Sequence, residues 1–373
     1  MKPLILALFL LSSVAGAQEA LVRVKNPAPF DRERETIEVG LSALKRAGVS
    51  SPFAVFEGER LILSQVIAEP SDAPLLIFQS GFRAGEKKTF TVRHSPGKGS
   101  DEGASDAKFI LPRRDVAWEN DRIAFRIYGG PLAGDVRDGL DVWVKRVRYH
   151  IIDKWYDGDS LRGAGRISYH VDHGEGADFF NVGRSLGAGG CALYSGGALH
   201  QAGLFTDYRI ISRGPIRSIF TVHYASDPSN GLNFPVVKTY SLDAGENLNR
   251  IDVSSGGAGE MAAGLVKRAG VVRYADEKLR WLSLWGRTDD DSTTGSLGTG
   301  LVVTAGSFSG LKEDKDHYLI VMKASPGKTL RYYAGAGWSR SGDFTDVTSW
   351  NDHLAAFARR LEYPLEIGFG AGK

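Results

Sequence analysis

The stretch SIFTVHYASDPSNGLNFPVVKTYSL, residues 218–242, decides the fold that the sequence predicts. Its two ends, 218–224 and 236–242, alternate between apolar and polar side chains and are rich in Val, Ile, Phe and Tyr. Asp, Pro, Ser, Asn and Gly lie between them. Alternation of this kind indicates β-strands, and the residues in between favour a turn or loop. The stretch therefore predicts two short strands of a sheet.

The same pattern recurs on both sides of this stretch. Short segments bounded by Gly, Pro, Asp or Asn occupy 89–94, 122–128, 141–151, 270–275, 300–306, 317–324 and 330–337. Many short strands at such spacing are typical of antiparallel sheets stacked as a sandwich or barrel. Glycine supplies 46 of 373 residues, above the usual share of about 7%, which fits many turns. The sequence therefore predicts an all-β protein.

One helix stands out near the C-terminus, in TSWNDHLAAFARRLEYP, residues 348–364. Thr348 or Ser349 can cap its start, and Pro364 stops it. The segment TIEVGLSALKRAG, residues 36–48, is ambiguous between a strand and a helix. Apolar side chains recur at helical spacing within 348–364, at Trp350, Leu354, Phe357 and Leu361. We expect this apolar stripe to pack on a sheet.

The N-terminus has the pattern of a secretory signal peptide. Lys2, an apolar run over 4–11 and the small residues Ala15-Gly16-Ala17 predict cleavage after residue 17 and a periplasmic or secreted protein. No later segment is long and apolar enough to predict a membrane anchor. The formal net charge of +2 gives no reason to expect nucleic acid or acidic lipid as a partner.

The polar run 94–109, rich in Gly and Ser, predicts a linker. We therefore expect a signal peptide (1–17), a small β-sandwich segment with its linker (18–115) and one large β-domain (116–373). The single cysteine, Cys191, excludes an internal disulfide, and its small neighbours favour a buried structural residue over a nucleophile.

Ionisable side chains gather in YHVDHGEGAD, residues 169–178, ahead of a glycine-rich run. If 167–172 is a strand, His170 and Asp172 share a polar face, and His173 lies where a turn begins. Glycine lets the backbone turn sharply and approach a ligand closely, which favours a cleft. We therefore predict a cleft lined by His170 and Asp172. The alternative is a solvated face followed by a glycine-rich loop.

The same residues leave a metal site open. His170, Asp172 and His173 resemble zinc-ligand spacing, although a strand would point the two histidines to opposite faces. Asp172, Glu175 and Asp178 could hold calcium in an irregular loop, although the spacing is not that of an EF-hand. Neither pattern identifies a metal, and we expect no cofactor.

Further candidates for substrate binding are scattered along the chain. Arg126, Arg184 and Arg217 could each hold a carboxylate in two parallel hydrogen bonds. Tyr332 and Trp338, set among glycines, could pack on a sugar ring. The alternatives are surface arginines and ordinary sheet aromatics. The sequence has no P-loop, dinucleotide fingerprint, G-x-S-x-G elbow or H-E-x-x-H motif, which argues against nucleotide-dependent chemistry, common serine hydrolases and zincin proteases.

Several segments together resemble the bacterial domain-of-unknown-function 4861 family. They are WENDRIAFRIYG (118–129), DVWVKR (141–146), YHVDHGEGADFFNVGRSLGAGG (169–190), GPIRSIFTVHY (214–224) and YYAGAGWSRSGDF (332–344). The resemblance covers nearly all of the mature chain. It implies export, a galactose-mutarotase-like supersandwich and an association with the breakdown of uronic-acid polysaccharides. It implies no particular reaction.

We therefore expect an enzyme that acts on uronic-acid oligosaccharides, most plausibly a lyase or dehydratase working by β-elimination. This reaction needs a base, an acid and a cation for the substrate carboxylate. His170 or His173 suits the base, Tyr169 or Tyr332 the acid, and Arg126 or Arg217 the cation. Asp172 would support His170, and Glu175 and Asp178 would contact substrate. A glycosidase using two of the three carboxylates, an epimerase and a non-catalytic sugar-binding module stay open.

Overall fold

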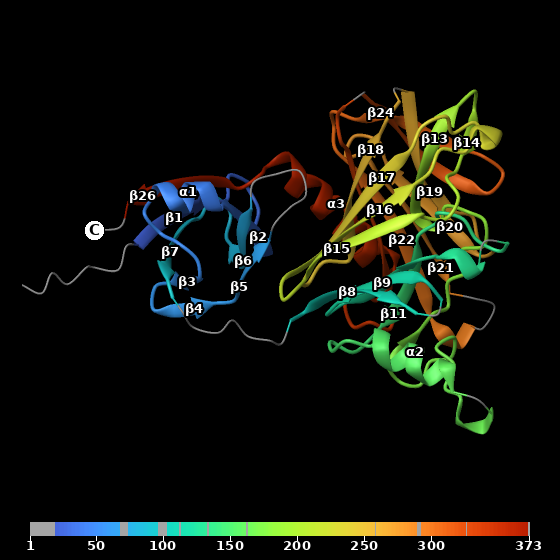
Figure 1. Cartoon of the computed structure of the whole chain (residues 1–373), viewed down its shortest axis with the longest axis horizontal. Coiled ribbons are helices and arrows are strands. Elements are labelled where there is room, and N and C mark those ends of the chain that lie inside the picture. The colour runs from blue at the N-terminus through green and yellow to red at the C-terminus, as the bar shows by residue number, and fades with distance from the viewer. Residues whose placement is uncertain are drawn as a thin grey trace, which may run out of the picture.

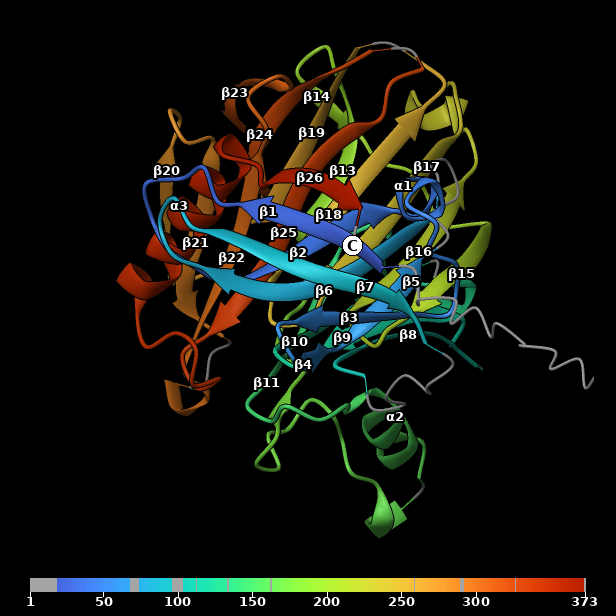
Figure 2. The same cartoon turned by 90° about the vertical axis from the view of Figure 1, so that its left-hand side faces the viewer.

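The computed structural model describes residues 19–67, 74–95, 103–111, 113–132, 134–161, 163–257, 259–288, 292–325 and 327–371. The expected signal peptide, 1–17, lies outside these ranges. Figure 1 shows a small β-sandwich in blue beside a large one coloured from green to red, and Figure 2 views the pair from the side of the small sandwich. The expected all-β class and the order of a small sandwich before a large supersandwich are confirmed.

The small sandwich packs two sheets around one apolar core, in which Val22, Phe78 and Phe90 are fully buried. Its strands run in the orders β26-β1-β7-β3-β4 and β2-β6-β5. The segment 36–48, which the sequence left ambiguous between a strand and a helix, contains both: the end of a strand is followed by a short helix. The elements are β1 (Glu19–Lys25), β2 (Arg32–Gly40), α1 (Leu41–Arg46), β3 (Phe53–Glu57), β4 (Arg60–Ile62), β5 (Ser64–Ile67), β6 (Leu75–Phe82), β7 (Lys87–His94) and β26 (Glu366–Ala371).

The two sandwiches do not divide the chain at a single point, so the expected boundary near residue 115 is wrong. Strand β8 (Ser105–Ile110), which lies largely inside the expected linker, pairs with β9 and belongs to the large sandwich. The last strand, β26, returns to the small sandwich and pairs antiparallel with β1, with Ile367 opposite Val24. This pairing covers an edge of β1 that would otherwise expose unpaired backbone groups.

The large sandwich packs one eight-stranded sheet against two five-stranded sheets. The orders are β15-β16-β17-β18-β25-β22-β21-β20, β14-β13-β19-β24-β23 and β12-β11-β10-β9-β8. All three sheets contribute to one buried core, for example through Phe220, Ile320 and Trp118. Cys191 is buried in it, as expected, and burial raises the pKa of its thiol to about 12.

The remaining strands of the large sandwich are β9 (Asp115–Asn120), β10 (Ile123–Ile127), β11 (Asp141–Lys145), β12 (Gly176–Ala177), β13 (Ala188–Ser195), β14 (Ala198–His200), β15 (Asp207–Arg213), β16 (Arg217–Tyr224), β17 (Val236–Asp243), β18 (Leu248–Ser255), β19 (Gly259–Val266), β20 (Val271–Asp276), β21 (Trp281–Arg287), β22 (Ser296–Val303), β23 (Phe308–Glu313), β24 (His317–Ala324) and β25 (Leu330–Trp338). Strands β16 and β17 are the two that the stretch 218–242 predicts. They pair antiparallel, with Phe220 opposite Tyr240.

Helix α3 (Val347–Glu362) confirms the predicted C-terminal helix and packs on the outer face of the eight-stranded sheet. Figure 1 shows it on the side that faces the small sandwich. Its cap is Asp346 rather than Thr348 or Ser349, and Ser349 completes a capping box. The sheet beneath is glycine-lined where the helix approaches: a Cβ on Gly298 would lie 2.6 Å from Trp350.

Two strand predictions in the remaining sheet are wrong, and both errors concern the candidate site. Strand β11 ends at Lys145, and 152–160 of the following chain form helix α2 (Ile152–Ser160). The first backbone amides of this helix, from Ile151 and Ile152, donate to the buried carboxylate of Glu119. Residues 167–172 form turns rather than a strand, because Asp172 accepts hydrogen bonds from the amides of Gly174 and Gly176.

Candidate functional site

A pocket of about 350 Å³ lies between α2 and the loop 167–176. We call it the Glu175 pocket. It sits over the outer face of the sheet β8–β12, at the end of the large sandwich from which α2 projects in Figure 1. Its lining consists of Val147, Tyr149, Lys154, Trp155, Ile167, Ser168, Tyr169, Val171, His173, Gly174, Glu175 and Gly176. Three of the predicted site residues, Tyr169, His173 and Glu175, therefore meet in one cavity.

Glu175 is the carboxylate at the centre of this lining. It accepts hydrogen bonds from the Tyr149 hydroxyl, from Lys154 Nζ at 2.6 Å and from Trp155 Nε1 at 3.1 Å. Burial would raise the pKa of Glu175, but these donors lower it overall. The same contact raises the pKa of Lys154 and of Tyr149. At neutral pH the pocket therefore holds a carboxylate, an ammonium and a protonated phenol in contact.

Aromatic rings support the pocket from below. Trp143 stacks on Trp155 at 5.6 Å and on Tyr169 at 4.8 Å between ring centroids. At the rim, Ile167 and Val171 are 54% and 53% exposed. The rim of the Glu175 pocket is therefore partly apolar.

The two histidines take different positions. His173 is exposed and lines the Glu175 pocket. His170 does not line it, and its Nδ1 donates to the carbonyl of Asp178 at 3.0 Å, which leaves Nε2 as the nitrogen able to accept a proton. The predicted support of His170 by Asp172 is wrong, because Asp172 pairs with Arg146 and holds the loop amides instead.

A buried charge cluster lies beneath Tyr169. Arg126 donates from Nε to Asp141 at 2.9 Å, from one terminal nitrogen to Asp178 at 2.9 Å, and from the other to the Tyr169 hydroxyl at 3.2 Å. Burial raises the pKa of both carboxyls, and the charge of Asp141 raises that of Asp178 further, well above its usual range. The two carboxyls therefore share the single positive charge of Arg126.

This cluster changes the roles expected for three residues. Arg126 and Asp178 are buried and paired with one another, so the expectation that they contact substrate is wrong. Tyr169 presents its ring to the pocket while its hydroxyl accepts from Arg126, which commits that oxygen to the cluster.

The other predicted residues lie away from the Glu175 pocket. Tyr332 and Trp338 are buried in the core, where their polar atoms donate to the carbonyls of Gly189 and Thr294, so their predicted contact with substrate is wrong. Arg184 is exposed and donates to the carbonyl of Gly134. Arg217 lies in a second cavity, and its guanidinium is paired with Asp243 and Glu38.

We call this second cavity the interdomain cleft. It has a volume of about 360 Å³ and separates β2 of the small sandwich from the eight-stranded sheet and α3. Its polar lining includes five arginines and four carboxylates: Arg32, Arg217, Arg250, Arg331, Arg360, Glu35, Glu38, Asp243 and Glu246. Tyr333 and Phe357 supply its aromatic surface.

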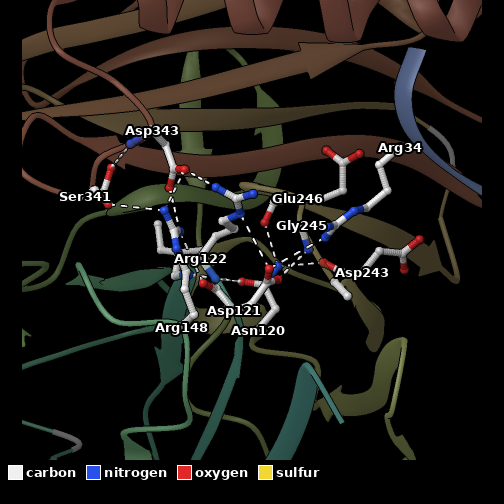
Figure 3. A network of polar contacts seen from close by, with 12 residues as sticks. Arg34, Asn120, Asp121, Arg122, Arg148, Asp243, Gly245, Glu246, Ser341 and Asp343 are labelled. Carbon is white, nitrogen blue, oxygen red and sulfur yellow. Dashed lines mark hydrogen bonds and ion pairs between the residues drawn. The ribbon is translucent and has the colours of Figure 1, made fainter. Parts of the chain in front are cut away.

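Figure 3 shows the polar network beside this cleft. Asp121, at the turn between β9 and β10, lies 3.6 Å from Arg34 of the small sandwich and accepts from the amide of Gly245 at 2.6 Å. Gly245 has φ +82°, a left-handed backbone conformation that favours glycine. The network thus fixes the turn that carries Glu246 into the cleft.

A family model described as "Domain of unknown function (DUF4861)" matches residues 24–367. The chain belongs to the DUF4861 family. One relative, "Uncharacterized protein P7" of Formosa agariphila, is 31% identical over 394 aligned residues that cover 97% of each chain. The family assignment confirms the resemblance drawn from the sequence.

Two solved structures from Enterococcus faecalis are similar at low level. A protein in the glycosyl hydrolase family 38 has a TM-score of 0.48 and 8% identity, with 96% of this DUF4861 chain and 48% of that chain covered. An alpha-mannosidase has a TM-score of 0.41 and 9% identity, with 95% and 46% covered. The chain thus spans about half the length of these two proteins.

Sequence reasoning missed the residues of α2 that complete the Glu175 pocket, Lys154 and Trp155, and also Tyr149. Reading 141–151 as one strand concealed them, although apolar residues at 151, 152, 155 and 156 have helical spacing. Sequence reasoning also selected Tyr332 for contact with substrate, whereas Tyr333 is the tyrosine that lines the interdomain cleft. Alternation along β25 turns Tyr332 inward and Tyr333 toward the interdomain cleft.

Within the described ranges, no three His, Cys, Asp or Glu side chains are grouped so that they could hold a metal ion. Asp172, Glu175 and Asp178 point to three different sets of partners, namely Arg146, Lys154 and Arg126. A search of the same residues finds no helix with the length and apolar character needed to cross a membrane.

Proposed function

We propose that this DUF4861 protein acts on oligosaccharides that contain uronic acid, and that it binds the reacting sugar in the Glu175 pocket. The observation that carries the proposal is the contact of Glu175 with Lys154 and Tyr149 in an aromatic-walled cavity with His173 at its rim. Aromatic faces pack on the C–H face of a sugar ring, and charged groups bind its hydroxyls and carboxylate.

The proposed reaction is a β-elimination. His173 takes the proton from the carbon next to the sugar carboxylate, a C=C bond forms, and the bond to the leaving oxygen one carbon further on breaks. Lys154 offsets the negative charge that grows on the carboxylate. Tyr149, whose pKa is raised by Glu175, stays protonated and supplies a proton to the leaving oxygen. Glu175 orients Lys154 and Tyr149.

This assignment places the base at His173 rather than His170. His173 lines the pocket, whereas His170 does not. A glycosidase with two carboxylates is less well supported, because Glu175 is the one carboxylate in the described lining of the pocket. A non-catalytic sugar-binding module is the second candidate, and the exposed Ile167 and Val171 at the rim favour it.

The test is to incubate the mature protein with a panel of uronic-acid oligosaccharides and follow product mass and ultraviolet absorbance. β-Elimination creates an unsaturated uronide that absorbs in the ultraviolet. We expect His173→Ala to lower kcat by about 10²- to 10⁴-fold with little change in KM. Glu175→Gln should lower kcat too, because an amide no longer balances Lys154.

His223→Ala is the matched control, since His223 is exposed on β16 and lies outside the lining of the Glu175 pocket. His170→Ala separates the two histidines, and we expect a smaller loss than for His173→Ala. Binding of the sugars without any unsaturated product, with binding weakened in Glu175→Gln, would replace the lyase by a binding module. Full activity of folded His173→Ala would refute the assignment of the base.

Export is part of the proposal, because polysaccharide fragments are met outside the cytoplasm. The basic start, the apolar run and Ala15-Gly16-Ala17 support it. N-terminal sequencing of protein secreted by a suitable host is expected to begin at Gln18. An intact Met1 on protein recovered from the cytosol would contradict export.

A further inference from the structure

The interdomain cleft divides into two charge groups. On one side, Arg32 and Arg360 pair with Glu35 and Glu246: Arg360 contacts Glu246 with both terminal nitrogens, at 3.0 and 3.1 Å. On the other side, Arg217, Arg250 and Arg331 gather around Asp243, Asp252 and Glu38. The first group joins α3 to β2, and the second covers the face of the eight-stranded sheet.

In the second group, Glu38 differs from the two aspartates. Asp243 and Asp252 come from the same sheet as the arginines and make paired contacts, for example Arg331 with Asp252 at 2.6 and 3.0 Å. Glu38 comes from the small sandwich, and its side chain is 37% exposed. It lies 2.5 Å from Arg217 and 3.7 Å from Arg250. Arg217 also pairs with Asp243, so another carboxylate can take the place of Glu38 without leaving this guanidinium unpaired.

The floor of the cleft carries a hydroxyl that the protein does not use. Ser241 is buried, with 4% of its surface exposed, and lines the cleft. Its Oγ makes no hydrogen bond to any part of the chain that the structure describes. A buried polar atom without a partner costs free energy unless a ligand or water satisfies it. Ser241 therefore points to a polar occupant of the cleft.

An aromatic surface lies beside these polar groups. The rings of Tyr333 and Phe357 meet edge to face, with centroids 4.9 Å apart, and both line the cleft. The cavity of about 360 Å³ lies at the low end of the range for small-molecule sites. Guanidinium groups, a hydroxyl and an aromatic face within such a volume suit a small ring that carries a carboxylate.

We propose that the interdomain cleft binds a uronate sugar, whose carboxylate takes the position of Glu38 beside Arg217 and Arg250, whose ring lies on Tyr333 and whose hydroxyl bonds to Ser241. Binding replaces a contact between the two sandwiches by a contact to ligand, so it couples the cleft to their association. The inference shares only the class of sugar with the proposed function, and it stands whether or not the Glu175 pocket performs chemistry.

Isothermal titration with galacturonate and with its neutral parent galactose tests the proposal. The titrations use the full mature chain carrying Lys154→Ala, which disables the Glu175 pocket. We expect Glu38→Gln to tighten galacturonate binding by about 3- to 10-fold, because the variant lacks the carboxylate that competes with the ligand. Among the described residues, the second charge group of the cleft then holds three guanidinium groups and two carboxylates. Ser241→Ala should weaken it by a similar factor without lowering Tm, since its hydroxyl bonds to nothing in the described chain.

Galactose should bind at least about 10-fold more weakly than galacturonate, because it lacks the carboxylate. His223→Ala, on an exposed part of the same sheet, is the control and should leave the affinity unchanged. Absence of galacturonate binding, equal affinity for galactose, or an affinity that ignores both Glu38→Gln and Ser241→Ala would overturn the proposal. A lower Tm of Glu38→Gln with no effect on binding would assign the cleft a purely structural role. None of these outcomes depends on product formation at the Glu175 pocket.

Discussion

The Glu175 pocket and the interdomain cleft are both lined by charges and rings, but they are assembled in opposite ways. The lining of the Glu175 pocket comes from 147–176, a short span of the chain. The lining of the cleft extends from Arg32 to Ile367 and draws on both sandwiches. A sequence motif can reveal a site of the first kind, because its residues are neighbours along the chain. A site of the second kind exists only once the fold has brought strands together.

The two sites also differ in how their charges are held. The Glu175 pocket rests on one buried guanidinium, Arg126, which holds two carboxyls and the Tyr169 hydroxyl. The cleft spreads its charge over five arginines in ion pairs of varied exposure. Removal of the cation should therefore be severe beneath the pocket and mild at an exposed arginine of the cleft such as Arg331.

The largest expected effect tests this contrast directly. Arg126→Met should lower the free energy of unfolding by about 3–5 kcal/mol, because it leaves Asp141 buried without its cation. Arg331→Met should cost no more than about 1 kcal/mol, because the Arg331 side chain is 44% exposed. Urea unfolding at pH 7 measures both. Equal losses would show that the two sites do not differ in this way.

Asp178→Asn is the matched variant within the buried cluster. Since burial and the charge of Asp141 raise the pKa of Asp178, an amide of the same shape should change stability by no more than about 1 kcal/mol. A loss as large as that of Arg126→Met would show that the cluster depends on a negative charge at Asp178.

The second prediction concerns how acid changes the stability of the protein through His353 of helix α3, which forms one wall of the cleft. His353 of α3 packs against Trp350 and Phe344, and this burial lowers its pKa to about 4. An unfolded histidine titrates near 6.5. Between these values the unfolded chain binds a proton that the folded chain does not, so stability falls as the pH drops from about 6.5 to 4. The loss from this group is at most about 3 kcal/mol.

His353→Phe keeps an aromatic ring and removes the titration, so its stability should depend less on pH in this window. Unfolding of both proteins at pH 7.5 and 4.5 measures the difference. The Glu175–Lys154 pair should persist over the same range, because the pKa of Glu175 is lowered and that of Lys154 is raised. Identical pH dependence of the two proteins would contradict the burial of a neutral His353.

The sequence predicted the fold better than it predicted the candidate site. Alternation identified several strands of the eight-stranded sheet, such as 218–224 and 236–242, because one face of each is buried in a common core, but it missed β15, β18 and β21. The period of α3 was equally clear. The return of β26 to the small sandwich was not predictable from local pattern, because its partner β1 lies more than 300 residues earlier.

The errors in the site have local physical causes. The run 167–172 alternates as a strand does, yet Asp172 binds backbone amides of the loop and forces a turn. Arg126 looked suited to a substrate carboxylate because the sequence cannot show that Asp141 and Asp178 already surround it. His173 and Glu175 were found because they lie within the motif itself.

The smallest effect tests the two tyrosines that separate core from cleft. Tyr332 donates its hydroxyl to the buried carbonyl of Gly189 at 2.8 Å. Tyr332→Phe should therefore cost about 1–3 kcal/mol, since that carbonyl loses its partner. Tyr333→Phe should lower the free energy of unfolding by no more than about 0.5 kcal/mol, because Tyr333 lines the cleft and the loss of its hydroxyl breaks no buried hydrogen bond. Urea unfolding of both variants decides the matter: a larger loss for Tyr333→Phe would place Tyr333, rather than Tyr332, among the hydrogen-bonded residues of the core.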